Sequence, residues 1–292
     1  MSSPTPHLHA VLWVLLSTLI WTVIFAAGKL TSGALGVFQL TLLRYLGAFP
    51  VIALLVLRHG GLRQHRSQRP LSHLARAICG CGAAVAITWA STRMPLIDAT
   101  AIGMLSGVIA TLLGAVVLRE TMRGNQIAAV ALSLLGAGIV VIGKGAFQTG
   151  VVILPALIAL ISALLMATEG LLISTLGRQE TARTVMLYVT CFGVCLMLVP
   201  ATLQWQQVTA KDLGFALALG PLSVLGQYCT IRGYRMAPLS VVAPLDYTWL
   251  IFAALLGLVA FNEHPSASTW AGCAAIALGG WMLTRTRAAP SN

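Results

Sequence analysis

The sequence predicts an all-α membrane protein with ten transmembrane helices in two inverted five-helix repeats. Charged residues make up only 9% of the 292 residues and hydrophobic residues 58%, whereas about a quarter of a soluble domain is charged. The charges fall between apolar runs of roughly 20 residues, the length that crosses a ~30 Å hydrocarbon layer. The two halves of the chain also carry the same sequence markers in the same order.

Charged positions and Pro or Gly breaks delimit the apolar runs. A helix satisfies its own backbone polar groups, as lipid requires, so each run is predicted to be one span. The first run is expected to be retained rather than cleaved, because the residues before it hold no Lys or Arg. The predicted spans cover about residues 10–28, 37–57, 73–92, 96–118, 125–143, 151–173, 184–202, 213–231, 239–261 and 269–284.

Positive charges in the loops predict the orientation of the spans. With a cytoplasmic N-terminus, the cytoplasmic loops and flanks hold thirteen cations: Arg58, Arg63, Arg66, Arg69, Arg76, Arg119, Arg123, Arg178, Arg183, Arg232, Arg235, Arg285 and Arg287. The opposite loops hold four: Lys29, Arg93, Lys144 and Lys211. This bias places both termini in the cytoplasm of a multi-pass protein of the cytoplasmic (inner) membrane. The net charge of +11 reflects insertion rather than a nucleic-acid partner.

The two halves share markers at a constant offset of 142 or 143 residues. Arg93-Met94-Pro95-Leu96 opens a run that ends at Glu120, and Arg235-Met236-Ala237-Pro238-Leu239 opens one that ends at Glu263. Because five spans are an odd number, the second copy enters the membrane inverted, as in many alternating-access transporters. Glu120 and Glu263 are expected to orient their helix ends. The predicted repeats cover residues 10–143 and 151–284.

Several motifs resemble the drug/metabolite transporter superfamily, specifically its EamA-type members. They are Trp21-Thr22-Val23-Ile24-Phe25 with Lys29, Leu43–Ala48, Ala243-Pro244-Leu245-Asp246-Tyr247-Thr248, Ala253–Gly257 and Phe261-Asn262-Glu263. The resemblance covers both halves, with departures at Thr22, where Gly is usual, and at Ser106-Gly107, where Pro is frequent. It implies secondary transport of a small molecule. Members that resemble this chain carry amino acids, riboflavin, S-adenosylmethionine, nucleotide sugars, metallophores or drugs.

Three ionisable residues lie within the predicted spans, where by default they face a bundle interior or a wet cavity. Arg44 can bind a carboxylate or phosphate through its fork of donors, or it is a structural partner of carbonyls or Asp98. Glu169 and Asp246 can bind an ammonium group or a coupling proton, and the alternative for Glu169 is snorkelling toward Arg178. Asp246 follows Pro244, which frees a backbone carbonyl and can open the helix toward a cavity.

Aromatic residues near these charges either line the path or anchor the interface. They are Trp21, Tyr45, Trp89, Tyr228, Tyr247 and Trp249. Gln227 either forms a hydrogen bond between helices or contacts the cargo. The predicted substrate path is Arg44, Tyr45, Trp21, Trp89, Gln227, Tyr228, Asp246 and Tyr247, with Asp246 and Glu169 as candidates for coupling.

No metal or cofactor is expected. The six cysteines lie in predicted spans, all six His lie outside or at span edges, and no HExxH, GxGxxG or P-loop pattern occurs. Small residues such as Gly103 with Gly107 and Ala275 with Gly279 are expected to pack helices inside the bundle rather than a dimer. A monomer and a homodimer both stay open.

The predicted function is export of a small polar or zwitterionic metabolite, such as an amino acid or metallophore, by alternating access. A proton or cargo gradient would drive it. The alternative is import of a heterocyclic vitamin or cofactor such as riboflavin or S-adenosylmethionine. An intramembrane enzyme is the remote alternative, because it would need a converging nucleophile and base.

Overall fold

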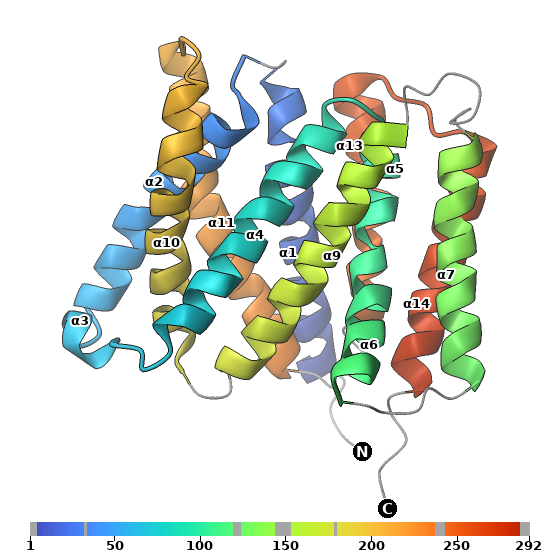
Figure 1. Ribbon diagram of the computed structural model, residues 1–292, viewed down its shortest axis with the longest axis horizontal. Helices are drawn as coiled ribbons and strands as arrows, with labels where there is room; N and C mark the ends of the chain where they lie inside the picture. The colour runs from blue at the N-terminus through green and yellow to red at the C-terminus, as the bar shows by residue number, and fades with distance from the viewer. Residues whose placement is uncertain are drawn as a thin grey trace, which may run out of the picture.

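The computed structural model describes residues 5–31, 34–118, 124–143, 153–177, 180–236 and 243–286, and every regular element in these ranges is a helix (Figure 1). Seven of these helices are long and apolar enough to cross a membrane, which confirms the predicted helical membrane fold. The number of ten spans stays a prediction. The seven are α1 (Thr5–Leu30), α2 (Val37–Leu57), α4 (Pro70–Ser91), α7 (Gly124–Gly143), α9 (Ile153–Gly177), α10 (Ala182–Leu203) and α11 (Ala210–Met236).

The predicted span over 96–118 is not one continuous helix. It consists of α5 (Leu96–Gly103) and α6 (Leu105–Leu118), which meet at Met104. Two glycines and a serine lie within four residues of the break, and all three have low intrinsic helix propensity. The helix is therefore interrupted at Met104, where a continuous helix was expected.

The described part of the predicted span over 239–261 is not a single α-helix either. It begins with η1 (Ala243–Tyr247), a 3₁₀ helix, and continues as α13 (Thr248–Phe261). Pro244 cannot donate a backbone hydrogen bond and clashes with a preceding α-helical turn, so a tighter turn replaces the α-helix around Asp246. The offset of 143 that relates Pro95 to Pro238 and Glu120 to Glu263 brings Met104 onto Tyr247, the last residue of η1, and the two breaks therefore occupy equivalent positions.

The described helices pack in a two-fold pattern. With α3 (Gly61–Gln64) left out and α14 (Ala267–Thr286) as the last described helix, the described helices up to α7 exchange in chain order with those from α9 onward. Under this exchange the α1–α11 contact becomes α4–α9, α2–α11 becomes α4–α10, and α6–α9 becomes α1–α13. All six pairs are in contact, and α7–α14 and α2–α10 map onto themselves. The packing is that of two inverted repeats.

Small residues occupy the closest helix crossings. Gly136 of α7 lies against Ala275 of α14, and Gly279 of α14 lies against Ser133 of α7. A side chain at any of these glycines would overlap the neighbouring helix, because small residues are what let backbones approach in lipid. The prediction that Ala275 and Gly279 pack inside the bundle is confirmed.

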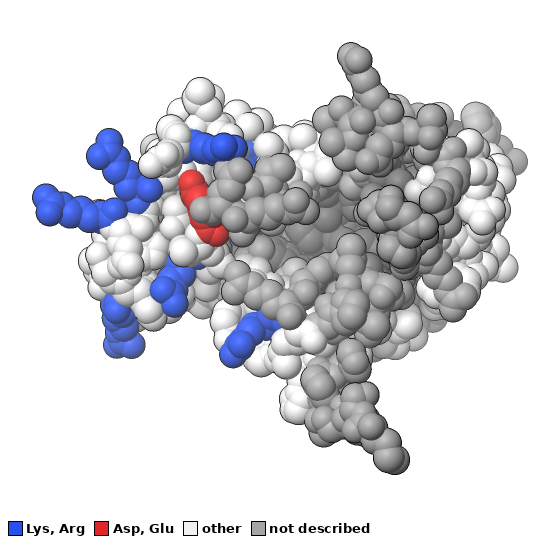
Figure 2. Space-filling model, turned by 90° about the horizontal axis from the view of Figure 1, so that it is seen from below, with Lys and Arg blue, Asp and Glu red and all other residues white. Residues whose placement is uncertain are grey.

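The start of α1, the end of α14 and α3 lie at the same end of the molecule, the lower end in Figure 1. We call it the terminal side. Seen from this end, Lys and Arg side chains gather on the surface (Figure 2). The concentration of cations at one end agrees with the charge bias of the loops. Which membrane face this end meets stays a prediction.

Candidate functional site

A cavity of about 430 Å³ lies between the helices of the two repeats. Its lining comes from α1, α2, α4, α6, α9, α10, α11, η1, α13 and the Met104 break. Both helix interruptions reach it, through Met104 and Asp246. Interrupted helices at equivalent positions of inverted repeats commonly form the substrate site of a carrier. Neither α7 nor α14 contributes to the described lining.

Four charged side chains line the cavity: Arg44, Arg76, Glu169 and Asp246. Arg44 is 8% exposed, and its guanidinium lies over the Tyr45 ring at 4.8 Å from the centroid. The sequence predicted Arg44 and Asp246 for the substrate path and Glu169 as a candidate for coupling. Two guanidinium groups and two carboxyl groups give the cavity both signs of charge, which suits a cargo that carries both.

Arg76 was assigned to a cytoplasmic flank, and this assignment is wrong. Its side chain is 2% exposed, donates from Nη1 to the Val185 carbonyl at 3.0 Å, and lies 3.6 Å from Glu169. Glu169 of α9 thus forms an ion pair with Arg76 of the neighbouring helix α4. Position alone did not separate Arg76 from the loop cations, because the predicted third span began only three residues earlier. Its presence inside a predicted span was the signal that could have found it.

Aromatic rings form another wall of the cavity. Trp21 stacks on Phe25 with centroids 5.7 Å apart, and Phe25 contacts Trp249 at 5.3 Å. The indole Nε1 of Trp21 donates to Thr230 at 3.5 Å. Because these rings are stacked on one another, they present a stiff apolar surface beside the charges.

Hydroxyl groups on the lining were not singled out in the sequence. Thr18 of α1 contacts Thr248 of α13 through their hydroxyls at 3.2 Å, beside the η1 break. Ser17 and Thr18 also return hydrogen bonds to their own helix. Single Ser and Thr residues are common in membrane helices, so no sequence signal distinguishes these from packing residues. Gln227 lines the cavity as predicted for the path.

Three residues of the predicted path do not belong to the described lining: Trp89, Tyr228 and Tyr247. The Arg93 guanidinium lies over the Trp89 ring, 3.9 Å from the ring centroid. Tyr228 is exposed, meets Trp13 edge-on and accepts from Arg232 at 2.9 Å. Tyr247 packs against the core formed by α5, α7 and α14. The structure thus brings together Arg44, Tyr45, Trp21, Gln227, Asp246 and Glu169.

The cavity lies toward the terminal side. The residues from α9 come from the half that ends there (Met166, Glu169, Gly170, Ile173), and those from α10 from the half that begins there (Met186, Val189, Thr190). On the opposite side, Lys29 pairs with Glu263 and donates to the Met94 carbonyl at 3.0 Å. Glu263 also accepts from the Leu96 backbone N–H at 2.8 Å. These contacts tie α1, α5 and the end of α13 together, and Glu263 orients helix ends as expected; Glu120 lies outside the described residues.

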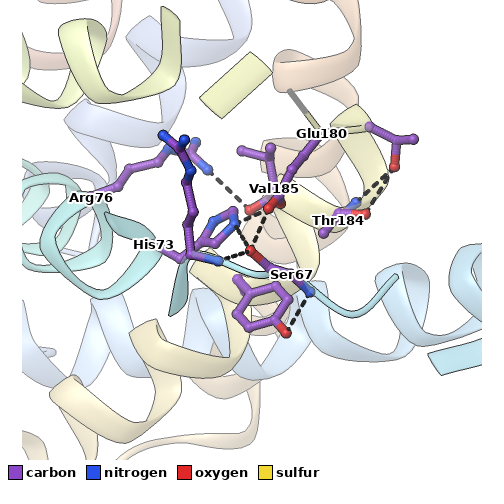
Figure 3. Close-up of polar contacts among 9 residues, drawn as sticks. Ser67, His73, Arg76, Glu180, Thr184 and Val185 are labelled. Carbon is purple, nitrogen blue, oxygen red and sulfur yellow. Dashed lines mark hydrogen bonds and ion pairs between the residues drawn. The ribbon is translucent and has the colours of Figure 1, made fainter. Parts of the chain in front are cut away.

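A polar cluster joins the loop before α4 to the start of α10 on the terminal side (Figure 3). His73 is fully buried, and its Nε2 lies 2.7 Å from Glu180 and 3.1 Å from the Ser67 hydroxyl. Ser67 donates its hydroxyl to Glu180 and its backbone N–H to Tyr188, which stacks on His73. No group of three His, Cys, Asp or Glu in the described ranges is arranged to hold a metal ion.

These features define a class of protein: a helical membrane carrier with a charged cavity at two interrupted helices. The model of the EamA-like transporter family matches twice, over residues 8–142 and 153–285, and the chain belongs to this family. A solved crystal structure with 21% sequence identity superposes with a TM-score of 0.67 and covers 96% of this chain and 98% of its own. That likeness shows the fold.

Three relatives align with most of this chain, and two of them are named as transporters. The chain is 26% identical to the pseudopaline exporter CntI of Pseudomonas aeruginosa, over 95% of this chain and 96% of the relative. It is 28% identical to protein RarD of Streptomyces exfoliatus, over 80% and 76%. It is 25% identical to a riboflavin transporter of Brucella anthropi, over 77% and 80%.

Proposed function

We propose that the protein exports a small polar or zwitterionic organic metabolite across the cytoplasmic membrane by alternating access. The observation that carries the proposal is a cavity with both signs of charge, set toward the terminal side and closed on the other side by Lys29 and Glu263. If the termini are cytoplasmic, this is the inward-facing state, ready to load cargo from the cell. The similarity to a pseudopaline exporter supports the outward direction.

In this proposal the two repeats, residues 10–143 and 151–284, rock against each other around the cavity. Arg44 binds an anionic group of the cargo, and Asp246 or Glu169 binds its amine or exchanges a proton with the cytoplasm. Trp21, Tyr45 and Gln227 complete the first contacts. The cargo leaves chemically unchanged, as expected of a carrier rather than an enzyme. Either a monomer or a homodimer is compatible with a cavity inside one chain.

Import of a heterocyclic vitamin is the second candidate. Trp21, which stacks on Phe25, and Trp249, which is tilted against Phe25, give an aromatic surface for such a molecule, and one relative is a riboflavin transporter. The charges favour export of a zwitterion, because the lining holds two guanidinium groups and two carboxyl groups and a neutral ring system offers no charge to bind them.

The test is counterflow in proteoliposomes that contain the purified protein. Liposomes loaded with a metabolite extract should accumulate labelled cargo from outside, and an Arg44→Ala variant should not. Mass spectrometry of the accumulated compound should show the unmodified molecule. A chemically altered product, or accumulation of riboflavin alone, would replace the proposal with an enzyme or with the importer, respectively.

A further inference from the structure

Two hydrogen-bond donors on the cavity wall are buried without a partner among the described residues: Nε of Arg76 and Nε1 of Trp249. The residues are 2% and 6% exposed. Buried donors are nearly always paired, so each of these marks a place where an acceptor is expected. Both are donors, and both belong to the lining of the same cavity.

The pairing of Arg76 with Glu169 leaves that donor open. Their closest N···O distance is 3.6 Å, too long for a hydrogen bond. One of five guanidinium N–H groups is used in the bond to Val185. The Glu169 side chain is 23% exposed and lies within electrostatic range of both Arg76 and Arg44. Glu169 therefore acts as a loose counter-ion that a better acceptor can displace.

The positions of the open donors indicate how many acceptor groups a cargo needs in order to satisfy them. Trp249 contacts Phe25 of α1 and Arg76 contacts α10, so the two open donors stand on different walls, and Arg44 supplies a further anion site. A cavity of about 430 Å³ falls in the range of about 300–1,000 Å³ that holds drug-sized ligands. The donors come from three helices, with Arg44 on α2, Arg76 on α4 and Trp249 on α13, so a molecule with several carboxylates can satisfy more of them than a single carboxylate can.

We propose that Arg76 is a second anion subsite and that the cargo is an amino-polycarboxylate. One carboxylate binds Arg44, and a second binds Arg76 through a bidentate pair that includes Nε. The amine is held by Asp246, and the second carboxylate takes the place of Glu169 beside Arg76. The proposal rests on the proposed transport function and names its cargo class.

The probes are meso-2,6-diaminopimelate and lysine, which differ by one carboxylate. Binding is measured on the full chain in lipid nanodiscs by titration calorimetry. We expect diaminopimelate to bind at least about tenfold more tightly than lysine, the gain of one charge-assisted contact. Arg76→Gln should remove this preference and leave lysine binding within about twofold, while Arg63→Gln, an exposed cation of α3, should keep it.

Two further variants test the proposal independently if Arg76→Gln fails to fold. Glu169→Gln keeps the shape and removes the competing counter-ion, so it should strengthen diaminopimelate binding. Trp249→Phe keeps the ring, removes the open donor and should weaken it. Equal binding of the two probes, or a Glu169→Gln variant that binds diaminopimelate more weakly, overturns the amino-polycarboxylate proposal. Transport in the counterflow assay would still stand in that case, because that assay uses a whole metabolite extract.

Discussion

Arg44 and Arg76 show how far single residues can be understood from the sequence. An arginine in the middle of an apolar run is conspicuous, because its burial is costly unless it faces a cavity, and Arg44 was found this way. Arg76 sits three residues into a run whose start is uncertain, so it was counted with the loop cations. Only the packing of α4 on α9 and α10 shows that its guanidinium points inward.

At Arg44 we expect Arg44→Ala to lower transport about 10- to 150-fold, the loss of a charge-assisted contact of about 1.5–3 kcal/mol. Arg44→Lys should also fail if the cargo is held bidentately, since an ammonium offers no planar fork. Initial rates of counterflow at equal protein density check this. Arg63→Ala is the matched control, and full activity of Arg44→Ala would reduce Arg44 to a packing residue.

At Asp246 we expect Asp246→Asn to uncouple transport from a pH gradient and to leave cargo exchange at equilibrium partly intact. The substitution keeps the shape of the η1 turn and removes the group that can exchange a proton. Flux with and without an imposed pH gradient gives the measurement. Asp212→Asn, at the start of α11 where Thr209 donates to the carboxylate, should keep the response. If Asp246→Asn retains pH-driven flux, Glu169 becomes the coupling residue.

At the scale of elements, the two helix interruptions were only half predictable. Pro244 signalled the break around Asp246, because proline removes a donor and clashes with the preceding turn. The break at Met104 has no proline, and Gly or Ser within an apolar run fits a continuous membrane helix equally well. The repeat offset was the usable signal: an interruption in one repeat implies one at the equivalent position of the other.

The closure on the side opposite the termini depends on Lys29 and Glu263. We expect Lys29→Met to open this side in part, because it leaves Glu263 without its cation and frees the Met94 carbonyl. In sealed proteoliposomes of defined orientation, a Phe25→Cys variant without the native cysteines should react faster with a membrane-impermeant thiol reagent added on this side. Lys211→Met, on the same side and exposed, is the control. Unchanged labelling would mean that apolar packing alone makes the seal.

The His73 cluster fastens the loop before α4 to the start of α10. We expect His73→Ala to lower thermal stability, since it leaves the Glu180 carboxylate with one hydrogen bond fewer and removes the stack on Tyr188. An unsatisfied buried polar group costs about 1–3 kcal/mol. His59→Ala, an exposed residue bonded to its own helix, should change the melting temperature little. Equal melting temperatures for both variants would contradict the assigned role of the cluster.

At the scale of the whole molecule, composition and loop charges were sufficient to predict a multi-span helical protein, because lipid permits few alternatives. The cavity was not predictable, since its walls come from nine helical segments far apart in the chain. Trp89 and Tyr228 illustrate the limit. Both lie near charges in sequence, yet neither belongs to the described lining.

The topology itself gives a prediction. Fusions of a periplasm-active reporter after Lys144 and at the C-terminus should report opposite sides, with the C-terminus in the cytoplasm, because twelve loop cations, with Arg76 left out, fall on the terminal side of the predicted arrangement and four on the other. Paired fusions with a cytoplasm-active reporter provide the control. Two periplasmic signals would overturn the inverted-repeat topology and the inward-facing assignment together.

Glu263 has a repeat counterpart in Glu120, but Lys29 has none: at the repeat offset its position falls on Leu171 or Leu172. The sequence therefore does not repeat the lysine of the Lys29–Glu263 pair, and we expect the two conformations to differ in free energy. The empty carrier then dwells mainly with its cavity toward the terminal side. Since apparent affinity scales with the population of the competent state, half-saturation should require less cargo at that face than at the other.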